Sequence, residues 1–361
     1  MSTKLQKLRA AMQQKNIQAI LASSEVNQRY LTSFAFTDGY VLVTPTAGYL
    51  VTDFRYREAA EAAVSPADFT VLTPEIGARA AIQGLLSDHG VTSLSVEGAT
   101  LSVDDFRYFE SLLKGVTLVP NASELIDELR LYKDQDEIDK MQRAQDIADA
   151  AFTHILTYIN PDRTEIDVAL ELEFFMRAHG AECVSFETIA VSGTASSLPH
   201  GHPRPVKLEK GFFTMDFGAR VDGYCSDMTR TVVIGRADDE IRHLYNTVLQ
   251  AQTAALAAAK IGVGLRALDR VARDIIDAHD AYRGAFGHSL GHGVGMYIHE
   301  APRLATKTPA DQVLKVGQVV TFEPGIYLAG KYGCRIEDMA VLREDGSLHN
   351  FTHSTKELIE L

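Results

Sequence analysis

Two aspartates in one apolar segment have the residue type and spacing of a metal site. Asp216 and Asp227 lie in FTMDFGARVDGYCSDMTRTVVIG, where the dipeptide Asp222-Gly223 predicts a hairpin turn. That turn sets Asp216 opposite Thr229, so both aspartates share one face as diagonal neighbours, with roughly 7–8 Å between their backbones. Carboxylates that close repel each other in a half-buried setting, and a divalent cation between them removes the repulsion. A solvated hairpin with two exposed acids is the alternative.

A second pair of acids occupies VVTFEPGIYLAGKYGCRIEDMAVL. Glu323 ends an apolar run before a Pro-Gly dipeptide, and Glu337 interrupts another apolar run. Arg335 lies two residues before Glu337, hence on the same face of a strand, where it could orient that carboxylate. A surface acid paired with arginine is the alternative. Acids are rarely buried without partners, so their place inside apolar runs favours a bound cation.

The elements around these acids occur twice. Helices are expected over 134–159 and 164–180 and again over 238–260 and 265–279, and strand-rich segments over 212–234 and 318–342. We interpret this order as a duplicated helix–helix–sheet unit, which places a shared site on the seam between its halves. Four carboxylates meeting there carry four negative charges, which two divalent cations would balance. Oxygen ligands with one imidazole favour Mn²⁺, Co²⁺ or Fe²⁺ over a thiolate zinc site.

The segment FGHSLGHGVGMYIHE allows two chemistries. Residues 287–291 fit G-x-S-x-G, the nucleophile elbow of serine esterases, and Asp311 and His349 follow in the order of a hydrolase triad. An elbow, however, needs a strand before Ser289 and a helix after it. The residues before Ser289 are helical and then polar, and those after it are rich in glycine, so a metal site fits the segment better.

Histidines are the candidate ligands and donors of this segment. His288, His292 and His299 stand among glycines, which let the backbone approach a bound group closely. A neutral imidazole there can bind a metal or donate a hydrogen bond. The segment has no H-E-x-x-H motif, because Ala-Pro-Arg follows His299-Glu300. His200, in SLPHGH, lies in a separate loop and is a further candidate.

Composition limits the partners and the compartment. The chain has 361 residues, enough for two domains, and a net charge of −13, which argues against nucleic acid or an anionic membrane as a partner. Three distant cysteines form neither a disulfide framework nor a zinc pattern and fit a reducing cytosol. No apolar run is long enough to span a membrane, and the N-terminal residues do not read as a signal peptide. We therefore expect a cytoplasmic protein.

The first third of the chain predicts an α/β domain with a mostly buried sheet. Strands are expected over 17–21, 40–44, 48–52, 69–72, 93–96 and 116–119, with helices over 3–15, 55–64, 76–89 and 103–113. This region holds no motif to which chemistry can be attached.

Four motifs together resemble one family. MDFGARVDGYCSDMTRT, GHSLGHGVGMYIHEAP, TFEPGIY and CRIEDM are similar to the Xaa-Pro peptidases of the pita-bread metallopeptidase fold, which include aminopeptidase P and prolidase. The resemblance covers the whole chain. It implies an α/β creatinase-like N-terminal domain over residues 1–122 and an α+β pita-bread catalytic domain with internal pseudo-twofold duplication over residues 123–361.

The resemblance also implies two divalent metal ions, Mn²⁺ foremost, with Co²⁺, Fe²⁺ or Zn²⁺ as alternatives. The implied ligands are Asp216, Asp227, His292, Glu323 and Glu337. Asp227 and Glu337 would contact both metals, and Glu323 would shuttle the proton of the attacking water. Non-enzymatic relatives on this fold lack this ligand set, whereas all five residues are present here. A catalytically inactive peptide-binding protein is nevertheless the alternative function.

Other roles follow from the same resemblance. His200 and His299 would stabilise the tetrahedral intermediate, and these two with His288, Arg303 and Arg335 would bind the substrate. Arg303 would meet a C-terminal carboxylate. The expected substrate is a peptide whose second residue is proline, and the expected assembly is a homodimer that binds neither nucleic acid nor membranes. The choice between dipeptides and longer peptides stays open.

Overall fold

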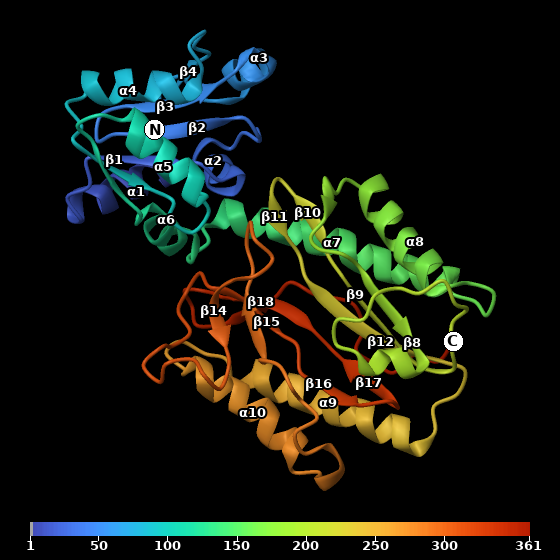
Figure 1. The fold of residues 1–361 in the computed structure, drawn as a ribbon. Helices are drawn as coiled ribbons and strands as arrows, with labels where there is room; N and C mark the ends of the chain where they lie inside the picture. The colour runs from blue at the N-terminus through green and yellow to red at the C-terminus, as the bar shows by residue number, and fades with distance from the viewer. Residues whose placement is uncertain (1–2) are drawn as a thin grey trace. The chain divides into compact units, whose positions relative to one another are not determined.

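The computed structural model describes residues 3–361, which form two compact units that divide between Arg130 and Leu131 (Figure 1). The first unit has a six-stranded sheet of order β4-β3-β2-β1-β5-β6. Its elements are α1 (Thr3–Gln14), β1 (Ala19–Ala22), α2 (Glu25–Thr32), β2 (Gly39–Val43), β3 (Gly48–Thr52), α3 (Phe54–Ala63), β4 (Thr70–Leu72), α4 (Ala78–Asp88), β5 (Ser93–Val96), α5 (Val103–Leu112), β6 (Thr117–Val119) and α6 (Ala122–Arg130). All six expected strands and all four expected helices are present, with ends shifted by a few residues.

Two helices of this unit, α2 and α6, lie outside the sequence predictions. α2 has only eight residues, and its buried side includes the polar Asn27 and Gln28, so it lacks apolar periodicity. Buried Glu97 holds the start of α2 by accepting hydrogen bonds from the backbone and the hydroxyl of Ser24. α6 begins at Ala122, at the expected domain boundary, and belongs to the first compact unit.

The second unit contains one order of elements twice. The first half comprises α7 (Gln135–Tyr158), α8 (Glu165–Ala178), β7 (Cys183–Val184), β8 (Ile189–Ser192), the 3₁₀ helix η1 (Gly193–Ser197), β9 (Gly211–Phe217), β10 (Ala219–Val221), β11 (Tyr224–Cys225) and β12 (Met228–Ile234). The second half comprises α9 (Asp239–Ala258), α10 (Leu265–Asp277), the 3₁₀ helix η2 (Asp280–Tyr282), β13 (Gly291–Gly293), β14 (Glu300–Leu304), β15 (Val319–Phe322), β16 (Gly325–Leu328), β17 (Tyr332–Arg335), β18 (Asp338–Leu342) and β19 (Leu348–Asn350). The two helix pairs, green and orange in Figure 1, lie on opposite sides of the strands.

The helices begin where the sequence predicts. Asp134 and Glu137 form a reciprocal capping box at the start of α7, as expected, and Thr164 forms a second one with Asp167 at α8. Apolar faces of α7 and α8 pack on the strands of the first half, and those of α9 and α10 pack on the strands of the second half. None of the helices within residues 3–361 is both long and apolar enough to cross a membrane.

Each half contains one long β-hairpin that is interrupted near its middle. In the first, β9 pairs with β12 and β10 with β11 in a single register, with Val221 opposite Tyr224 at the tip. Asp222 and Gly223 at this tip have φ angles of 50° and 86°. Two positive φ angles are the requirement of a type I′ turn, so the predicted two-residue turn is confirmed. In the second hairpin, β15–β18 and β16–β17 likewise share one register.

Candidate metal centre

Side chains from both halves line a cavity of about 390 Å³ in the second unit. Every residue to which the sequence assigned a role lines this cavity: His200, Asp216, Asp227, His288, His292, His299, Arg303, Glu323, Arg335 and Glu337. The four acids therefore meet at one place, although 121 positions of the sequence separate Asp216 from Glu337. Phe186, Ile189 and Ile298 give part of the cavity an apolar lining.

The first two acids are placed by the first hairpin. Asp216 lies on β9 directly opposite Thr229, as predicted, and Asp227 lies in the interruption just before β12. The shared register sets Gly218 opposite Asp227. A Cβ atom at Gly218 would lie 2.0 Å from the carbonyl oxygen of Ser226. Only glycine fits at that point, so the interruption that presents Asp227 requires it.

The other two acids are placed by the second hairpin. Phe322 pairs with Asp338, and Gly325 pairs with Arg335, so the register between these pairs sets Glu323 directly opposite Glu337. Both acids lie in the short interruption that separates β15 from β16 and β17 from β18. The two hairpins meet here, because the backbone N–H of Glu337 donates to the carbonyl of Thr229 over 3.1 Å.

His292 on β13 turns one ring nitrogen toward the acids. Its Nδ1 lies 3.1 Å from the carbonyl oxygen of Gly293, which can only accept, so Nδ1 carries the proton. Nε2 then presents a lone pair, 3.5 Å from Asp227 Oδ2 and 3.3 Å from Glu323 Oε1. A Cβ atom at the neighbouring Gly291 would lie 2.0 Å from the carbonyl oxygen of Thr321, so β13 can approach β15 only with glycine there.

Burial makes this cluster unfavourable as a set of bare charges. Burial first, and then the neighbouring acids, raise the pKa of Asp227 and of Glu337 well above their ordinary values. Burial likewise raises the pKa of Glu323 to about 8 and lowers the pKa of His292 to about 3. The acids therefore need cations or protons beside them, while the imidazole stays neutral and able to ligate.

The donor set fits a divalent cation. One ligand atom each from Asp227, His292 and Glu337 lie within 4.8 Å of one another. Asp216 Oδ1 is buried and has no hydrogen-bond partner within residues 3–361. A buried carboxylate oxygen without a donor is costly unless a cation faces it. Carboxylate oxygens with a single neutral imidazole are ligands of the kind that Mn²⁺ and similar cations bind.

Arg335, which the sequence suggests could orient Glu337, is connected to that carboxylate through Thr229. Its Nη2 lies 2.6 Å from Asp216 Oδ2, and its Nε donates to Thr229 Oγ1 over 2.9 Å. Thr229 in turn donates its hydroxyl proton to Glu337 Oε2 over 2.7 Å. The long side chain of Arg335 thus reaches the first hairpin, and Thr229 connects it to Glu337.

The remaining histidines surround the acids. The His299 ring lies edge-to-face with the His292 ring at 4.5 Å between centroids, and burial lowers the pKa of His299. His288 donates from Nδ1 to the carbonyl of Ser289, and its Nε2 accepts from the Tyr327 hydroxyl over 3.0 Å. Burial also lowers the pKa of His288 to about 4. His200 lies in the loop after η1.

The serine esterase alternative finds no support in this arrangement. Ser289 lies in a loop between η2 and β13, so the strand-to-helix turn of a nucleophile elbow is absent there. His349 hydrogen-bonds to Gln142 through Nε2 over 3.0 Å. Asp311 lies in the connection between β14 and β15. No Ser–His–Asp contact is formed by these residues.

Three hydroxyl residues of the site lie outside the sequence predictions. Thr229 joins Arg335 to Glu337, and Tyr327 accepts from Arg335 Nη1 over 2.7 Å while it donates to His288. Thr321 accepts from the backbone N–H of His292 and lies within hydrogen-bond distance of Glu323. Hydroxyl residues are common in strands, so only the position of Thr229 opposite Asp216 could have pointed to one of them.

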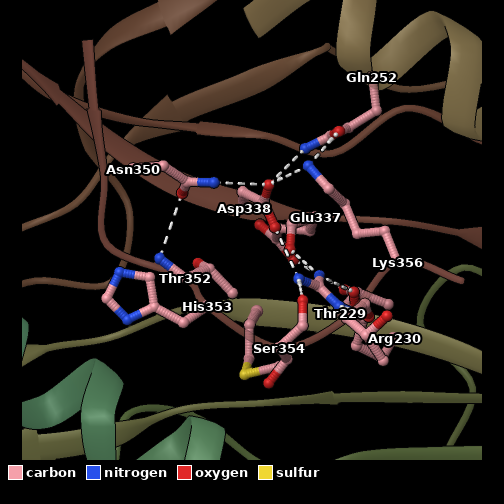
Figure 2. A network of polar contacts seen from close by, with 12 residues as sticks. Thr229, Arg230, Gln252, Glu337, Asp338, Asn350, Thr352, His353, Ser354 and Lys356 are labelled. Carbon is pink, nitrogen blue, oxygen red and sulfur yellow. Dashed lines mark hydrogen bonds and ion pairs between the residues drawn. The ribbon is translucent and has the colours of Figure 1, made fainter.

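A buried polar network lies behind Glu337 (Figure 2). Arg230 donates to the backbone carbonyl of Glu337 over 2.6 Å and to Asp338 Oδ1 over 2.8 Å. Lys356 Nζ lies 2.6 Å from Asp338 Oδ2, and Gln252 from α9 donates to the same oxygen. Burial alone would raise the pKa of Asp338, but the charges of Arg230 and Lys356 lower it. The network fixes the backbone that presents Glu337.

Comparison with known proteins agrees with this geometry. Residues 139–344 match the family model of metallopeptidase family M24, and residues 4–132 match that of the creatinase/prolidase N-terminal domain. Together these matches define a two-domain metallopeptidase. The chain belongs to metallopeptidase family M24.

Relatives match the chain along almost its full length. It is 33% identical to the Xaa-Pro dipeptidase of Pyrococcus horikoshii over 99% of both proteins. Among solved structures, the Xaa-Pro dipeptidase from Bacillus anthracis aligns with a TM-score of 0.92 at 40% identity, covering 99% of each chain. The X-Pro aminopeptidase from Thermotoga maritima aligns with a TM-score of 0.90 at 34% identity, over 98% of this chain and 100% of that one.

These matches test the expectations drawn from the resemblance. The expected fold, a creatinase-like α/β domain followed by a duplicated pita-bread catalytic domain, is confirmed. The expectation that the chain is a metallopeptidase is confirmed as well.

Proposed function

We propose that the protein hydrolyses the peptide bond between an N-terminal residue and a following proline. The observation that carries this proposal is the meeting of Asp216, Asp227, His292, Glu323 and Glu337 at one cavity. Full-length relatives named Xaa-Pro dipeptidase and X-Pro aminopeptidase support the substrate class.

Two divalent cations, Mn²⁺ foremost, would be held by these five residues. When bound, such a pair lowers the pKa of a bound water and polarises the carbonyl of the scissile bond. The neutral His292 supplies Nε2, and the four carboxylates supply oxygen atoms. Co²⁺, Fe²⁺ and Zn²⁺ are the alternatives that the same donor set accepts.

Protein groups move the protons of the reaction. Glu323 lies at the cavity beside His292, where its carboxylate takes the proton of the attacking water and delivers it to the proline nitrogen as the bond breaks. His299 is neutral near pH 7 because burial lowers its pKa, so it donates an N–H to the carbonyl oxygen as negative charge develops. His200, which also lines the cavity, would donate a hydrogen bond to the same oxygen.

Substrate selection rests on the cavity walls. Proline has no amide N–H and a fixed φ angle, so a pocket shaped for its ring discriminates against other residues. Arg303 lies opposite His292 in the β13–β14 pair and is placed to bind a carboxylate. Arg335 is already paired with Asp216. Arg303 is therefore the arginine of the cavity that would bind a substrate carboxylate. His288, which hydrogen-bonds to Tyr327, lines the same cavity.

Hydrolysis of Ala-Pro beside Ala-Pro-Ala with Mn²⁺ added tests the proposal. We expect release of alanine from at least one of them, abolished by a chelator and restored by Mn²⁺. Cleavage of the dipeptide alone assigns a prolidase, and cleavage of the tripeptide assigns an aminopeptidase P. A protein that binds two Mn²⁺ ions and cleaves neither peptide would instead be a peptide-binding relative.

We also propose a homodimer in the cytoplasm. The three cysteines Cys183, Cys225 and Cys334 are free thiols, which suits a reducing compartment. Light scattering after size-exclusion chromatography tests the dimer directly.

A further inference from the structure

An ion pair with a buried carboxylate lies on helix α10, behind the histidine segment. Asp269 and Arg273 are one helical turn apart, and Arg273 Nε lies 3.0 Å from Asp269 Oδ2. The Asp269 side chain is fully buried. A buried carboxylate is costly unless charged or hydrogen-bonding partners compensate it. The hydrogen bonds around this pair therefore indicate its structural role.

The hydrogen bonds of the pair to the histidine segment go to its backbone. Arg273 donates from Nη1 to the carbonyl of Phe286 over 2.6 Å and from Nη2 to the carbonyl of His288 over 2.7 Å. Asp269 Oδ1 accepts from the backbone N–H of Leu290 over 2.9 Å. The guanidinium also lies over the Phe286 ring, 4.4 Å from its centroid.

These bonds replace the secondary structure that the segment lacks. Residues 286–290 belong to neither a helix nor a strand, so their backbone groups have no ladder to satisfy them. The planar guanidinium of Arg273 donates to the carbonyls of Phe286 and His288. Asp269 accepts from the N–H of Leu290. The pair therefore fixes the path of the chain immediately before His292.

The same path continues into the acid cluster. The carbonyl of Leu290, whose N–H is held by Asp269, accepts a hydrogen bond from the backbone N–H of Glu323 over 2.8 Å. His292 follows two residues later, and its own N–H donates to Thr321 over 3.1 Å. A single residue, Leu290, thus connects Asp269 to Glu323, which is an expected metal ligand.

We propose that Asp269 and Arg273 are positioning residues for the metal centre, holding the backbone from Phe286 to Leu290 so that His292 and Glu323 converge. This inference rests on the proposed function, since it concerns the same metal centre. It predicts that weakening the pair lowers metal affinity through the backbone, without removal of any ligand.

Arg273→Lys is the informative variant, because lysine keeps a positive charge beside Asp269. An ammonium on a flexible stem cannot reproduce the planar fork that holds two carbonyls together. We expect Mn²⁺ affinity, measured by calorimetry on metal-free protein, to fall about tenfold, the lower end of what outer ligand-orienting groups contribute. Asp269→Asn is the second variant, and it should lose affinity in the same direction.

The same helix offers a matched control. Arg270 and Asp274 form a pair with the same spacing on the exposed face of α10, 3.7 Å apart. Arg270→Lys should leave Mn²⁺ affinity and turnover unchanged. Circular dichroism and melting temperature of each metal-free variant show whether any loss reflects a general loss of folding.

Hydrogen exchange supplies a readout that needs neither metal nor activity. In metal-free Arg273→Lys, the amide of Leu290 should exchange faster than in the wild type, with α10 itself still protected. Wild-type Mn²⁺ affinity in both Arg273→Lys and Asp269→Asn, or an equal loss in Arg270→Lys, would overturn the inference. Failure of the proposed function has a different signature, namely a wild-type protein that binds no Mn²⁺ or cleaves no Xaa-Pro peptide.

Discussion

The two halves of the catalytic unit share their architecture but differ in what they bring to the cavity. Each has a helix pair and an interrupted hairpin, and each hairpin supplies two acids. The difference lies in the strand beside each hairpin. In the first half β8 is Ile-Ala-Val-Ser, whereas in the second half β13 is Gly-His-Gly and carries His292. The second half thus brings a histidine between two glycines to the cavity, at a strand position where the first half has an apolar strand.

The hairpins also present their acids differently. In the second hairpin Glu323 and Glu337 are directly opposite each other, whereas in the first Asp216 and Asp227 are diagonal, with Gly218 opposite Asp227. The two hairpins meet where the backbone N–H of Glu337 donates to the carbonyl of Thr229. Because the hairpins place their acids differently, Asp227 from the first half and Glu337 from the second lie close together.

Both halves brace a histidine-bearing segment with a buried acid from their second helix. In the first half Glu165 at the start of α8 accepts from the backbone N–H and hydroxyl of Ser192, both over 2.7 Å. It also pairs with Arg204 over 2.6 Å, on the far side of the His200 loop. In the second half Asp269 has the corresponding task. The loops between the helices make matching bridges, from residue 164 to residue 207 and from residue 264 to residue 313.

The largest expected effect comes from removing one acid of the proposed metal centre. Asp227→Asn should lose metal and activity by more than about a hundredfold, because loss of a ligand exceeds the cost of losing an outer group. Glu337→Gln should match it if the two halves contribute equally. Elemental analysis and Ala-Pro or Ala-Pro-Ala hydrolysis measure both. Ser289→Ala is the control and should keep most activity; full loss in this variant with metals bound would reverse the assignment.

Much of the local structure of the two halves could be predicted from residues that are close together in the sequence. Asp222-Gly223 predicts a turn from two residues alone, and the turn then fixes the partner of Asp216 through the period of the strand. The capping box at Asp134 is likewise contained within four residues. The bond from Arg335 to Asp216 was missed because it joins the two halves across 119 positions. Pattern and spacing constrain neighbours along the chain, whereas such contacts depend on how separate hairpins pack.

The next effect concerns two glycines, one in each half, at points of very close backbone approach. Gly218→Ala in the first half and Gly291→Ala in the second would each place a Cβ atom 2.0 Å from a carbonyl oxygen. We expect each to lower the free energy of unfolding by about 3 kcal/mol, the upper end of overpacking costs. Denaturant unfolding of metal-free protein measures it. Gly287→Ala, which meets no atom within 4 Å, should change stability little.

A smaller effect, which depends on pH, concerns Glu165, the brace of the first half. Burial would raise the pKa of Glu165, but hydrogen bonds from Arg204 and Ser192 outweigh it and lower that pKa below its ordinary value. A carboxyl group with a lowered folded-state pKa stabilises the fold above its unfolded-state pKa, and this stabilisation disappears as pH falls through the folded-state value.

Glu165→Gln tests this brace, because glutamine keeps the shape and loses the charge. We expect a loss of about 2 kcal/mol in the free energy of unfolding at pH 7, typical of hydrogen bonds to a charged group. The difference between wild type and variant should shrink below about pH 4.3, the ordinary value for glutamate. A difference that stays constant from pH 7 to pH 3 would show that the charge of Glu165 does not contribute.

The smallest expected effect lies at the tips of the hairpins. Gly223 and Gly330 have φ angles of 86° and 73°, a region that L-residues enter at a cost. Gly223→Ala and Gly330→Ala should each cost about 1 kcal/mol in unfolding free energy, with metal affinity and turnover unchanged. The register of each hairpin is also held by the strands on both sides of the interruption, so the acids keep their places when a tip is strained. Loss of metal affinity in only one of the two variants would show that this half depends on its turn to align its acids, and the halves would then differ in stability as well as in chemistry.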